Sequence, residues 1–241
     1  MMRRQIIVVG VWLLGMLAVT TQDGLSYEVI TVHDGGSIDG TVTFSGQRSV
    51  LAPLSISKDQ EICGKTEKSD ESLVVGENQG IQNAVVSIVN IERGKQFSTK
   101  SMMLDQKECR YAPHVLLVPA GSNVSIINND GILHNIHTYS SKNPPINEAQ
   151  PKFKKVIKKK FSEAEVIKIS CDAHAWMSGW FVVQEHPYYA ITDESGHFLI
   201  ENIPPGHYDI KVWHESLQEK TRSVDVVPKM KSEVNVKLSD R

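Results

Sequence analysis

Turn-forming residues interrupt this chain at short intervals, and their spacing limits the fold more than any other feature of the sequence. Clusters of glycine, proline, asparagine and aspartate separate short runs rich in valine, isoleucine and aromatic side chains. After residue 26 no long stretch has a helical apolar period. Strands are predicted at 40–44, 84–89, 114–118, 124–127, 166–169, 180–183, 198–200 and 208–212. Many short strands with regular turns are typical of β-sandwiches, so the predicted fold class is all-β.

The first 26 residues have the layout of a secretory signal peptide. Two arginines near the start precede an apolar run from Ile6 to Val19, and small residues, Gly24 and Ser26, follow it. The apolar run is shorter than the roughly 20 residues of a membrane-spanning helix. We therefore expect cleavage after Ser26 and an exported, periplasmic type of protein. Retention as an uncleaved anchor is the alternative, and it is the one case in which membrane contact is expected.

Charge argues against a nucleic-acid partner. The formal net charge of the whole chain is −2, and removal of residues 1–26 changes it to −3 because two arginines and one aspartate are lost. Nucleic-acid-binding domains are usually strongly basic. A lysine-rich stretch at 152–160 is the exception to this balance. It is interpreted either as a solvated strand face or as a docking patch for an acidic partner.

The chain has three cysteines, an odd number for an exported protein. Pairing two of them leaves one thiol for a different task. Cys171 lies among histidine and methionine residues, so it is the one expected to stay unpaired. A Cys63–Cys109 disulfide would then follow, although the sequence alone does not fix the connectivity.

The segment Cys171-Asp-Ala-His174-Ala-Trp-Met177 places a thiolate, an imidazole and a thioether within seven residues at the end of a predicted strand. Copper that cycles between Cu(I) and Cu(II) favours this set. A zinc knuckle would need a second pair of Cys or His ligands, which is missing. A fourth ligand is expected from His134, which follows the strand at 124–127 and a turn. The alternative is an inert buried thiol beside a surface imidazole and a core methionine.

These residues resemble a known family. Asn128-x5-His134-Asn135, followed by Cys171-x2-His174-x2-Met177, is similar to the cupredoxins, the small blue copper proteins, and among them to the amicyanin and plastocyanin type. The 37-residue spacing between His134 and Cys171 is also similar to that family. Tyr111-Ala-Pro113 and Val118-Pro-Ala-Gly121 resemble its strand entering the core. The resemblance covers about 80 residues and implies a Greek-key β-sandwich with one bound copper ion.

The resemblance also implies roles for single residues. His134, Cys171 and His174 would be equatorial ligands and Met177 the axial one. The backbone N–H of Asn135 would point at the thiolate, and Asn128 would brace the same turn.

A second resemblance concerns both ends of the chain. Residues 192–210 are similar to the second half of the carboxypeptidase regulatory-like, or transthyretin-like, β-sandwich, and Gly40-Thr-Val42 with 83–88 are similar to its first half. We therefore predict a signal peptide at 1–26, the first part of this sandwich at 27–96, a cupredoxin-like copper domain at 97–187 and the second part at 188–241. In the tandem alternative, 27–95 completes the copper domain.

Other aromatic and histidine residues have open interpretations. His137 lies three residues after His134, so on a strand it faces the opposite side and is expected in solvent. His114 could form a second metal site with His186 or His214, or all three could be scattered polar residues. Trp176 could cover the copper, belong to a contact surface or pack in the core.

Three functions fit these features. The first is a one-electron carrier in which His174 lies near the surface as the electron exit, with a cytochrome or a dehydrogenase as redox partner. The second is copper storage, sensing or delivery, and the third is a structural or glycan-binding exported protein. An enzyme is not expected, since Ser170 and Asp172 flank Cys171 where a multicopper oxidase has histidines. The loop also lacks the second cysteine of a binuclear copper site, and the chain has no Gly-x-Ser-x-Gly motif.

Overall fold

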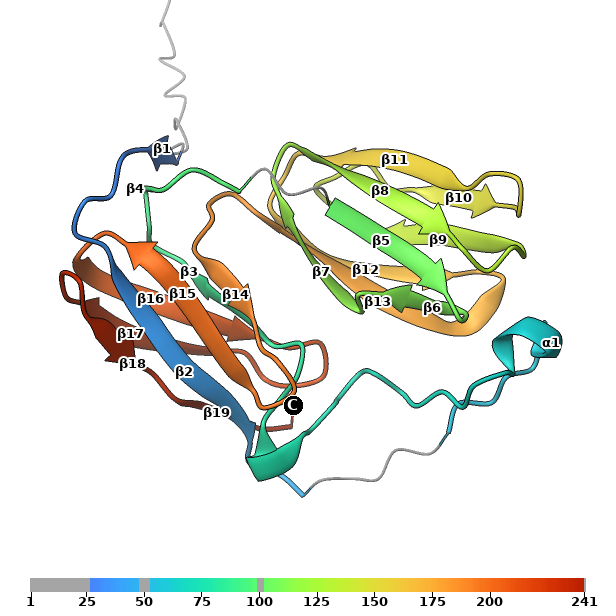
Figure 1. Cartoon of the computed structure of the whole chain (residues 1–241), viewed down its shortest axis with the longest axis horizontal. Helices are drawn as coiled ribbons and strands as arrows, with labels where there is room; N and C mark the ends of the chain where they lie inside the picture. The colour runs from blue at the N-terminus through green and yellow to red at the C-terminus, as the bar shows by residue number, and fades with distance from the viewer. Residues whose placement is uncertain (1–26, 48–52, 99–101, 241) are drawn as a thin grey trace, which may run out of the picture.

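The computed structural model describes residues 27–47, 53–98 and 102–240 (Figure 1). The predicted signal peptide, 1–26, lies outside them. Nearly all regular structure in the described residues is β, which confirms the predicted fold class. The two helical segments there are single turns, α1 (Gln60–Cys63) and η1 (Glu77–Gln79). Among the described residues, no helix has the length and apolar character needed to cross a membrane.

A continuous stretch of chain forms one β-sandwich, which we call the central sandwich (Figure 1). Its two sheets have the orders β10-β9-β12-β13-β7 and β11-β8-β5-β6. The strands are β5 (Met102–Lys107), β6 (Arg110–Ala112), β7 (Val115–Pro119), β8 (Ser122–Asn128), β9 (His134–Tyr139), β10 (Asn147–Gln150), β11 (Val156–Phe161), β12 (Glu165–Cys171) and β13 (His174–Gln184).

Strands from both sides of that stretch form a second sandwich, the flanking sandwich. Its sheets have the orders β14-β3-β16-β17 and β15-β2-β18, with β19 also paired to β2. The strands are β2 (Gly36–Phe44), β3 (Val85–Ile88), β14 (Tyr189–Ile191), β15 (His197–Ile203), β16 (Gly206–Trp213), β17 (Lys220–Val226), β18 (Lys231–Glu233) and β19 (Val236–Leu238). The short strands β1 (Glu28–Val29) and β4 (Arg93–Gly94) form a separate two-stranded sheet, and their neighbours Tyr27 and Ile91 pack on the core of the flanking sandwich.

Each sandwich has its own apolar core. A smaller cluster that includes Val85, Val115 and Val182 joins them, and Trp180 meets Trp213 there with ring centroids 5.2 Å apart. The transthyretin-like nature of the flanking sandwich and the four domain boundaries stay predictions.

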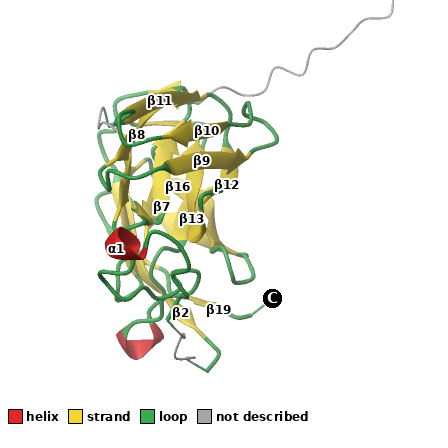
Figure 2. Cartoon of the chain, turned by 90° about the vertical axis from the view of Figure 1, so that its right-hand side faces the viewer, coloured by secondary structure: helices red, strands yellow, loops and turns green. Residues whose placement is uncertain are grey.

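One segment, residues 53–72, leaves the flanking sandwich after β2 and reaches across to the central one. Figure 1 shows α1 of this segment beyond the end of β6 and β13, and Figure 2 shows it in front of the sheets. A disulfide between Cys63 and Cys109 fastens it to the β5–β6 turn. Ile56 and Ile62 pack against the central core. Part of the chain assigned by sequence to 27–96 therefore lies against the central sandwich.

Candidate metal centre

Strand periodicity directs Cys171 into the central core. Along β12 the inward positions are Ile167, Ile169 and Cys171, and the residues between them are more exposed. The chain then turns within two residues and returns as β13, so that Cys171 pairs directly with His174. Residues opposite each other in an antiparallel pair point to the same face of the sheet. The Cys171 and His174 side chains therefore both face the interior of the sandwich.

The adjacent strand β9 brings in His134 by the same rule. His134, Ile136 and Thr138 alternate inward along β9, and all three are buried. On its other side β9 pairs with β10, where Gln150 lies opposite His134. A residue 37 positions before Cys171 thus comes to lie beside it.

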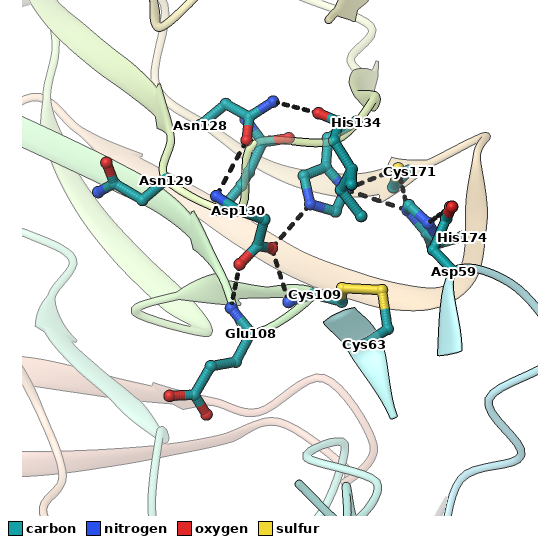
Figure 3. A network of polar contacts seen from close by, with 12 residues as sticks. Asp59, Cys63, Glu108, Cys109, Asn128, Asn129, Asp130, His134, Cys171 and His174 are labelled. Carbon is teal, nitrogen blue, oxygen red and sulfur yellow. Dashed lines mark hydrogen bonds and ion pairs between the residues drawn. A yellow bond between two sulfur atoms is a disulfide. The ribbon is translucent and has the colours of Figure 1, made fainter. Parts of the chain in front are cut away.

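The three side chains meet through specific atoms, as Figure 3 shows. His134 Nδ1 lies 3.0 Å from His174 Nδ1 and 3.9 Å from Cys171 Sγ, and His174 Nδ1 lies 3.7 Å from the same sulfur. The circle through three atoms at these separations has a radius of about 2.1 Å, and metal bonds to imidazole nitrogen and thiolate sulfur are about 2.0 to 2.3 Å long. All three residues are buried, with exposed fractions of at most 2 %. The donor set thus fits a soft metal ion of that size.

Met177, the fourth predicted ligand, is buried in the same core as Cys171. It follows a break in the register of the β12–β13 hairpin: Cys171 pairs with His174, but Ser170 pairs with Ser178. Residues 175–177 are therefore extra residues on β13, a bulge of the kind that redirects side chains. Met177 is buried on the inner side of this bulge, and its role as a fourth ligand stays a prediction.

Each histidine donates from its outer nitrogen to a carboxylate. His134 Nε2 lies 2.8 Å from Asp130 Oδ2, and His174 Nε2 lies 2.8 Å from Asp59 Oδ2 (Figure 3). Carboxylate partners of this kind fix the ring orientation and leave Nδ1 free to bind a metal. Neither aspartate was predicted from the sequence. Asp130 sits in the turn just before His134, whereas Asp59 lies 115 positions from His174, and its one sequence signal is its place four residues before Cys63.

Two asparagines hold the strands around the centre. Asn128 is fully buried, and its amide donates to the carbonyls of Ile132 and Gln150 at 2.8 Å each. Asn135 accepts from the backbone N–H of Asp172 at 3.1 Å through its side-chain oxygen. Asn128 therefore braces the turn before His134, and Asn135 ties β9 to the turn between Cys171 and His174.

The two imidazoles have opposite pKa shifts in the metal-free protein. Burial lowers the pKa of His134, but hydrogen bonds to Asp130 and Cys171 outweigh it and raise the pKa to about 8. Burial lowers the pKa of His174, and the nearby His134 lowers it further against the opposing effect of Asp59. Two ring nitrogens 3.0 Å apart also do not both carry a proton at low cost. In this state His134 holds the proton and His174 is neutral.

His174 has no exposed surface of its own, but its Nε2 lies directly beneath the Asp59 carboxylate, whose side chain is 37% exposed. The exposed fraction of His174 is 0 %, because Asp59 and the segment around it cover the ring edge. Trp176 is half-buried, lies 5.0 Å from the His174 ring between centroids and donates to the Cys109 carbonyl.

The remaining histidines stay outside the centre. His137 is partly exposed and contacts Asp172. Among the described residues, His114, His186 and His214 belong to no group of three metal-ligating side chains. Cys109, Asp130 and His134 form such a group, but the Cys109 sulfur is bonded to Cys63.

Comparison with known proteins gives only remote likenesses. No family model and no curated protein matches the chain. Among solved structures, a purple cupredoxin from Nitrosopumilus maritimus is 23% identical, with 35% of this chain and 100% of that chain covered and a TM-score of 0.30. Amicyanin from Paracoccus versutus is 18% identical over 37% of this chain and 86% of that chain, with a TM-score of 0.32. A copper-containing nitrite reductase from Thermus scotoductus is 18% identical over 41% and 25%, with a TM-score of 0.33. These likenesses are too remote to assign a function, and the geometry of the centre is the stronger guide.

Proposed function

We propose that this protein is an exported copper protein that carries single electrons, with one ion held by His134, Cys171 and His174 and by Met177 as a weak axial ligand. The observation that carries the proposal is the buried triangle of two Nδ1 atoms and one Sγ atom, whose size suits a bound metal. Two imidazoles and a thiolate in a trigonal set, with a distant thioether, are the ligands of blue-copper electron-transfer sites. Copper bound there supplies a one-electron couple between Cu(I) and Cu(II).

The protein's own residues would keep the ligands still while the charge of the ion changes. Cys171 and His174 stand on two paired strands, and His134 stands on the strand next to them. Asp59 and Asp130 fix the imidazole orientations from outside. A ligand set held by paired strands and hydrogen bonds changes little between oxidation states, which favours rapid electron transfer.

The Cys63–Cys109 disulfide supports export to an oxidising compartment such as the periplasm. Disulfides persist there and are rare in the cytosol. The signal-peptide layout of residues 1–26 agrees with this placement. We propose no enzymatic activity, because Ser170 and Asp172 stand where a multicopper oxidase needs histidines beside its thiolate.

Cu(II) titration of the purified protein tests the proposal. We expect an intense visible absorption and a narrow copper splitting in electron paramagnetic resonance, with one ion bound per chain. Both signals should be lost in Cys171→Ser and in His134→Ala and kept in His137→Ala, which removes an imidazole from the same strand outside the triangle. Weak absorption with an ordinary square-planar spectrum would refute the electron-transfer site.

A redox partner such as a cytochrome or a dehydrogenase is proposed to dock on the basic run at β11. Lys158 and Lys160 are exposed there, whereas Lys154 and Lys159 are each held 2.5 Å from Glu148. Exposed lysines speed encounter with an acidic partner in a salt-dependent way. Electron-transfer rates with an acidic cytochrome should fall with salt, and Lys158→Ala/Lys160→Ala should weaken that dependence. A salt dependence unchanged in this variant would refute the patch.

Copper storage or delivery is the second candidate function, and the complete burial of His174 favours it. A buried imidazole edge slows electron exchange with a partner but protects a stored ion. Electron self-exchange separates the two. A fast rate supports the carrier, and tight binding with negligible exchange supports storage.

A further inference from the structure

Residues 53–72, which we call the cover, close the metal centre from outside the central sandwich. The cover supplies Asp59, whose carboxylate lies 2.8 Å from His174 Nε2, and it leaves His174 with no exposed surface. Lys58 donates to the carbonyl of Ala173 in the turn between the two ligands, at 3.4 Å. The cover therefore touches both a ligand and the hairpin that presents it.

The underside of the cover also faces the fourth ligand. A cavity of about 200 Å³ separates the cover from β13, and Met177 contributes to its wall. It is lined by Leu54, Glu71, Arg110, Trp176 and Met177 among others. Met177 therefore borders a cavity that residues of the cover wall on one side.

A second carboxylate, that of Asp130, orients His134, and it is held next to Cys109 at the other end of the Cys63–Cys109 disulfide. Glu108 and Cys109 form the two-residue turn between β5 and β6, and both have positive φ, 55° and 54°. Their backbone N–H groups donate to Asp130 at 2.6 and 2.8 Å, and Asp130 in turn contacts His134 Nε2. Figure 3 shows the Cys63–Cys109 disulfide and the bonds from Glu108 and Cys109 to Asp130, with Asp59 on the other side of the centre beside His174. One covalent bond thus lies between the two groups that orient the two imidazoles.

The other attachments of the cover are weak. The Glu71–Arg110 ion pair, 3.1 Å long, is partly exposed, and such pairs add little stability. Glu71 also lies 3.9 Å from His114, Ser72 accepts one hydrogen bond from Ser216, and Ile56 and Ile62 pack against the central core. The disulfide closes a loop of 46 positions, which restricts the chain far more than any of these contacts.

We propose that the Cys63–Cys109 disulfide is a lock that keeps the cover closed, with Asp59 and Asp130 as positioning residues for His174 and His134, so that reduction of the disulfide opens the centre to copper exchange. This inference rests on the proposed copper site. The reductant is a dithiol. One of its thiolates attacks a sulfur of the disulfide and its second thiol resolves the mixed disulfide. Two electrons and two protons pass to the protein, which gains two thiols as the reductant becomes a disulfide.

Opening the lock has a defined structural consequence. Without the bond the cover is held by its weak contacts, so Asp59 separates from His174 and the ring edge is exposed. On the central sandwich, the Glu108–Cys109 turn has two non-glycine residues in the left-handed region, and it loses the covalent bond that anchors it to the cover. Both imidazoles then lose orientation, and bound copper becomes accessible to an acceptor.

The test is the rate at which full-length Cu(I)-loaded protein loses copper to excess bathocuproine disulfonate. Loss of a carboxylate that orients a ligand weakens metal binding roughly 10- to 100-fold, and we expect faster loss by that factor in Asp59→Asn and in Cys63→Ala/Cys109→Ala. Glu61→Gln, an exposed carboxylate in the same turn of helix, is the matched control and should change the rate by less than about twofold. Asp59→Asn added to the double cysteine variant should change the rate little further, because loss of the disulfide already breaks the contact between Asp59 and His174.

Two further readouts separate positioning from a merely structural role. Asp59→Asn should alter the copper splitting in electron paramagnetic resonance while the urea midpoint of the metal-free protein stays unchanged. In the metal-free double cysteine variant, amide hydrogen exchange should accelerate over residues 53–72 and stay unchanged in β12 and β13. If the double cysteine variant does not fold, full-length wild type reduced with dithiothreitol takes its place in both measurements, and Asp59→Asn, which keeps the disulfide, tests the positioning role by itself.

Wild-type loss rates in both Asp59→Asn and the cysteine variant, with the copper spectrum intact, would overturn the lock. Absence of any intense copper spectrum in the wild type would instead overturn the proposed function. The hydrogen-exchange comparison would still test the lock in that case, because it needs no copper.

Discussion

Replacing Asn128 with alanine removes the main internal brace of the turn that carries His134. Asn128 is the last inward residue of β8 and has no exposed surface. Its amide donates to two carbonyls, those of Ile132 and Gln150, and its oxygen accepts from the backbone N–H of Asp130 at 3.2 Å. Alanine would leave all three backbone groups without this partner. We therefore expect both lower stability and a disturbed position of His134.

The magnitude follows from the three hydrogen bonds. A buried hydrogen bond contributes roughly 1 kcal/mol net, so Asn128→Ala should destabilise the metal-free protein by about 3 kcal/mol. With a urea slope of about 2 kcal/mol per molar, the unfolding midpoint should fall by about 1.5 M. Asn129→Ala is the matched control. This neighbour is exposed and pairs with Asp105, so its loss should cost less than about 0.5 kcal/mol.

Tryptophan fluorescence during urea unfolding measures both variants, since Trp176 and Trp180 lie in the central sandwich. If the two sandwiches unfold separately, only the transition of the central one should move. Comparable midpoints for Asn128→Ala and Asn129→Ala would show that the turn does not depend on this brace. A changed copper spectrum with unchanged stability would also contradict the reasoning, because the same bonds are held to do both.

Two further predictions concern protons. Partial burial raises the pKa of the Glu165 carboxyl, but hydrogen bonds from Ser141 and Asn143 outweigh this effect and lower the pKa to about 2. The ionised carboxylate therefore stabilises the folded protein above pH 4.5, and this stabilisation is lost as the pH falls towards 2. Glu165→Gln should cost roughly 2 kcal/mol of stability at pH 7, and the urea unfolding midpoint of this variant should fall less than that of the wild type between pH 7 and pH 3. An equal fall in the two proteins would contradict this. The pKa of about 8 at His134 means that copper uptake at pH 7 must displace its proton, so affinity should fall as the pH is lowered below 8. Calorimetry in two buffers of different ionisation heat should show about one more proton released at pH 7 than at pH 9, and equal release would refute the assignment.

Much of the fold could be predicted from the sequence because the formation of a strand depends on residues that are neighbours in the chain. In β12 the alternation of Ile167 and Ile169 with exposed residues already places Cys171 on the inner face. Pairing of sheets is not local, and the parallel neighbours β13 and β7 lie on separate stretches of chain. Their adjacency depends on packing of both cores, which no short motif encodes.

The same distinction between local and distant contacts applies to the three side chains of the centre. Cys171 and His174 sit on one hairpin, so their spacing alone brings them together, and His134 needs only the neighbouring strand. The exposure of His174 could not be judged in this way. Burial depends on what covers a residue, and here the covering segment lies more than 100 positions earlier in the chain.

The expected Cys63–Cys109 disulfide is the sequence feature from which the place of Asp59 beside the centre could have been predicted. Once Cys63 is expected to pair with Cys109, the segment around Cys63 must lie beside the β5–β6 turn. Asp59 precedes Cys63 by four residues, one turn of chain, so its carboxylate comes within reach of any ligand near Cys109. Charge then selects the partner, because a buried imidazole with one nitrogen turned to a metal favours a carboxylate at the other. A structural disulfide beside an unpaired cysteine is therefore evidence about the metal site as well as about stability.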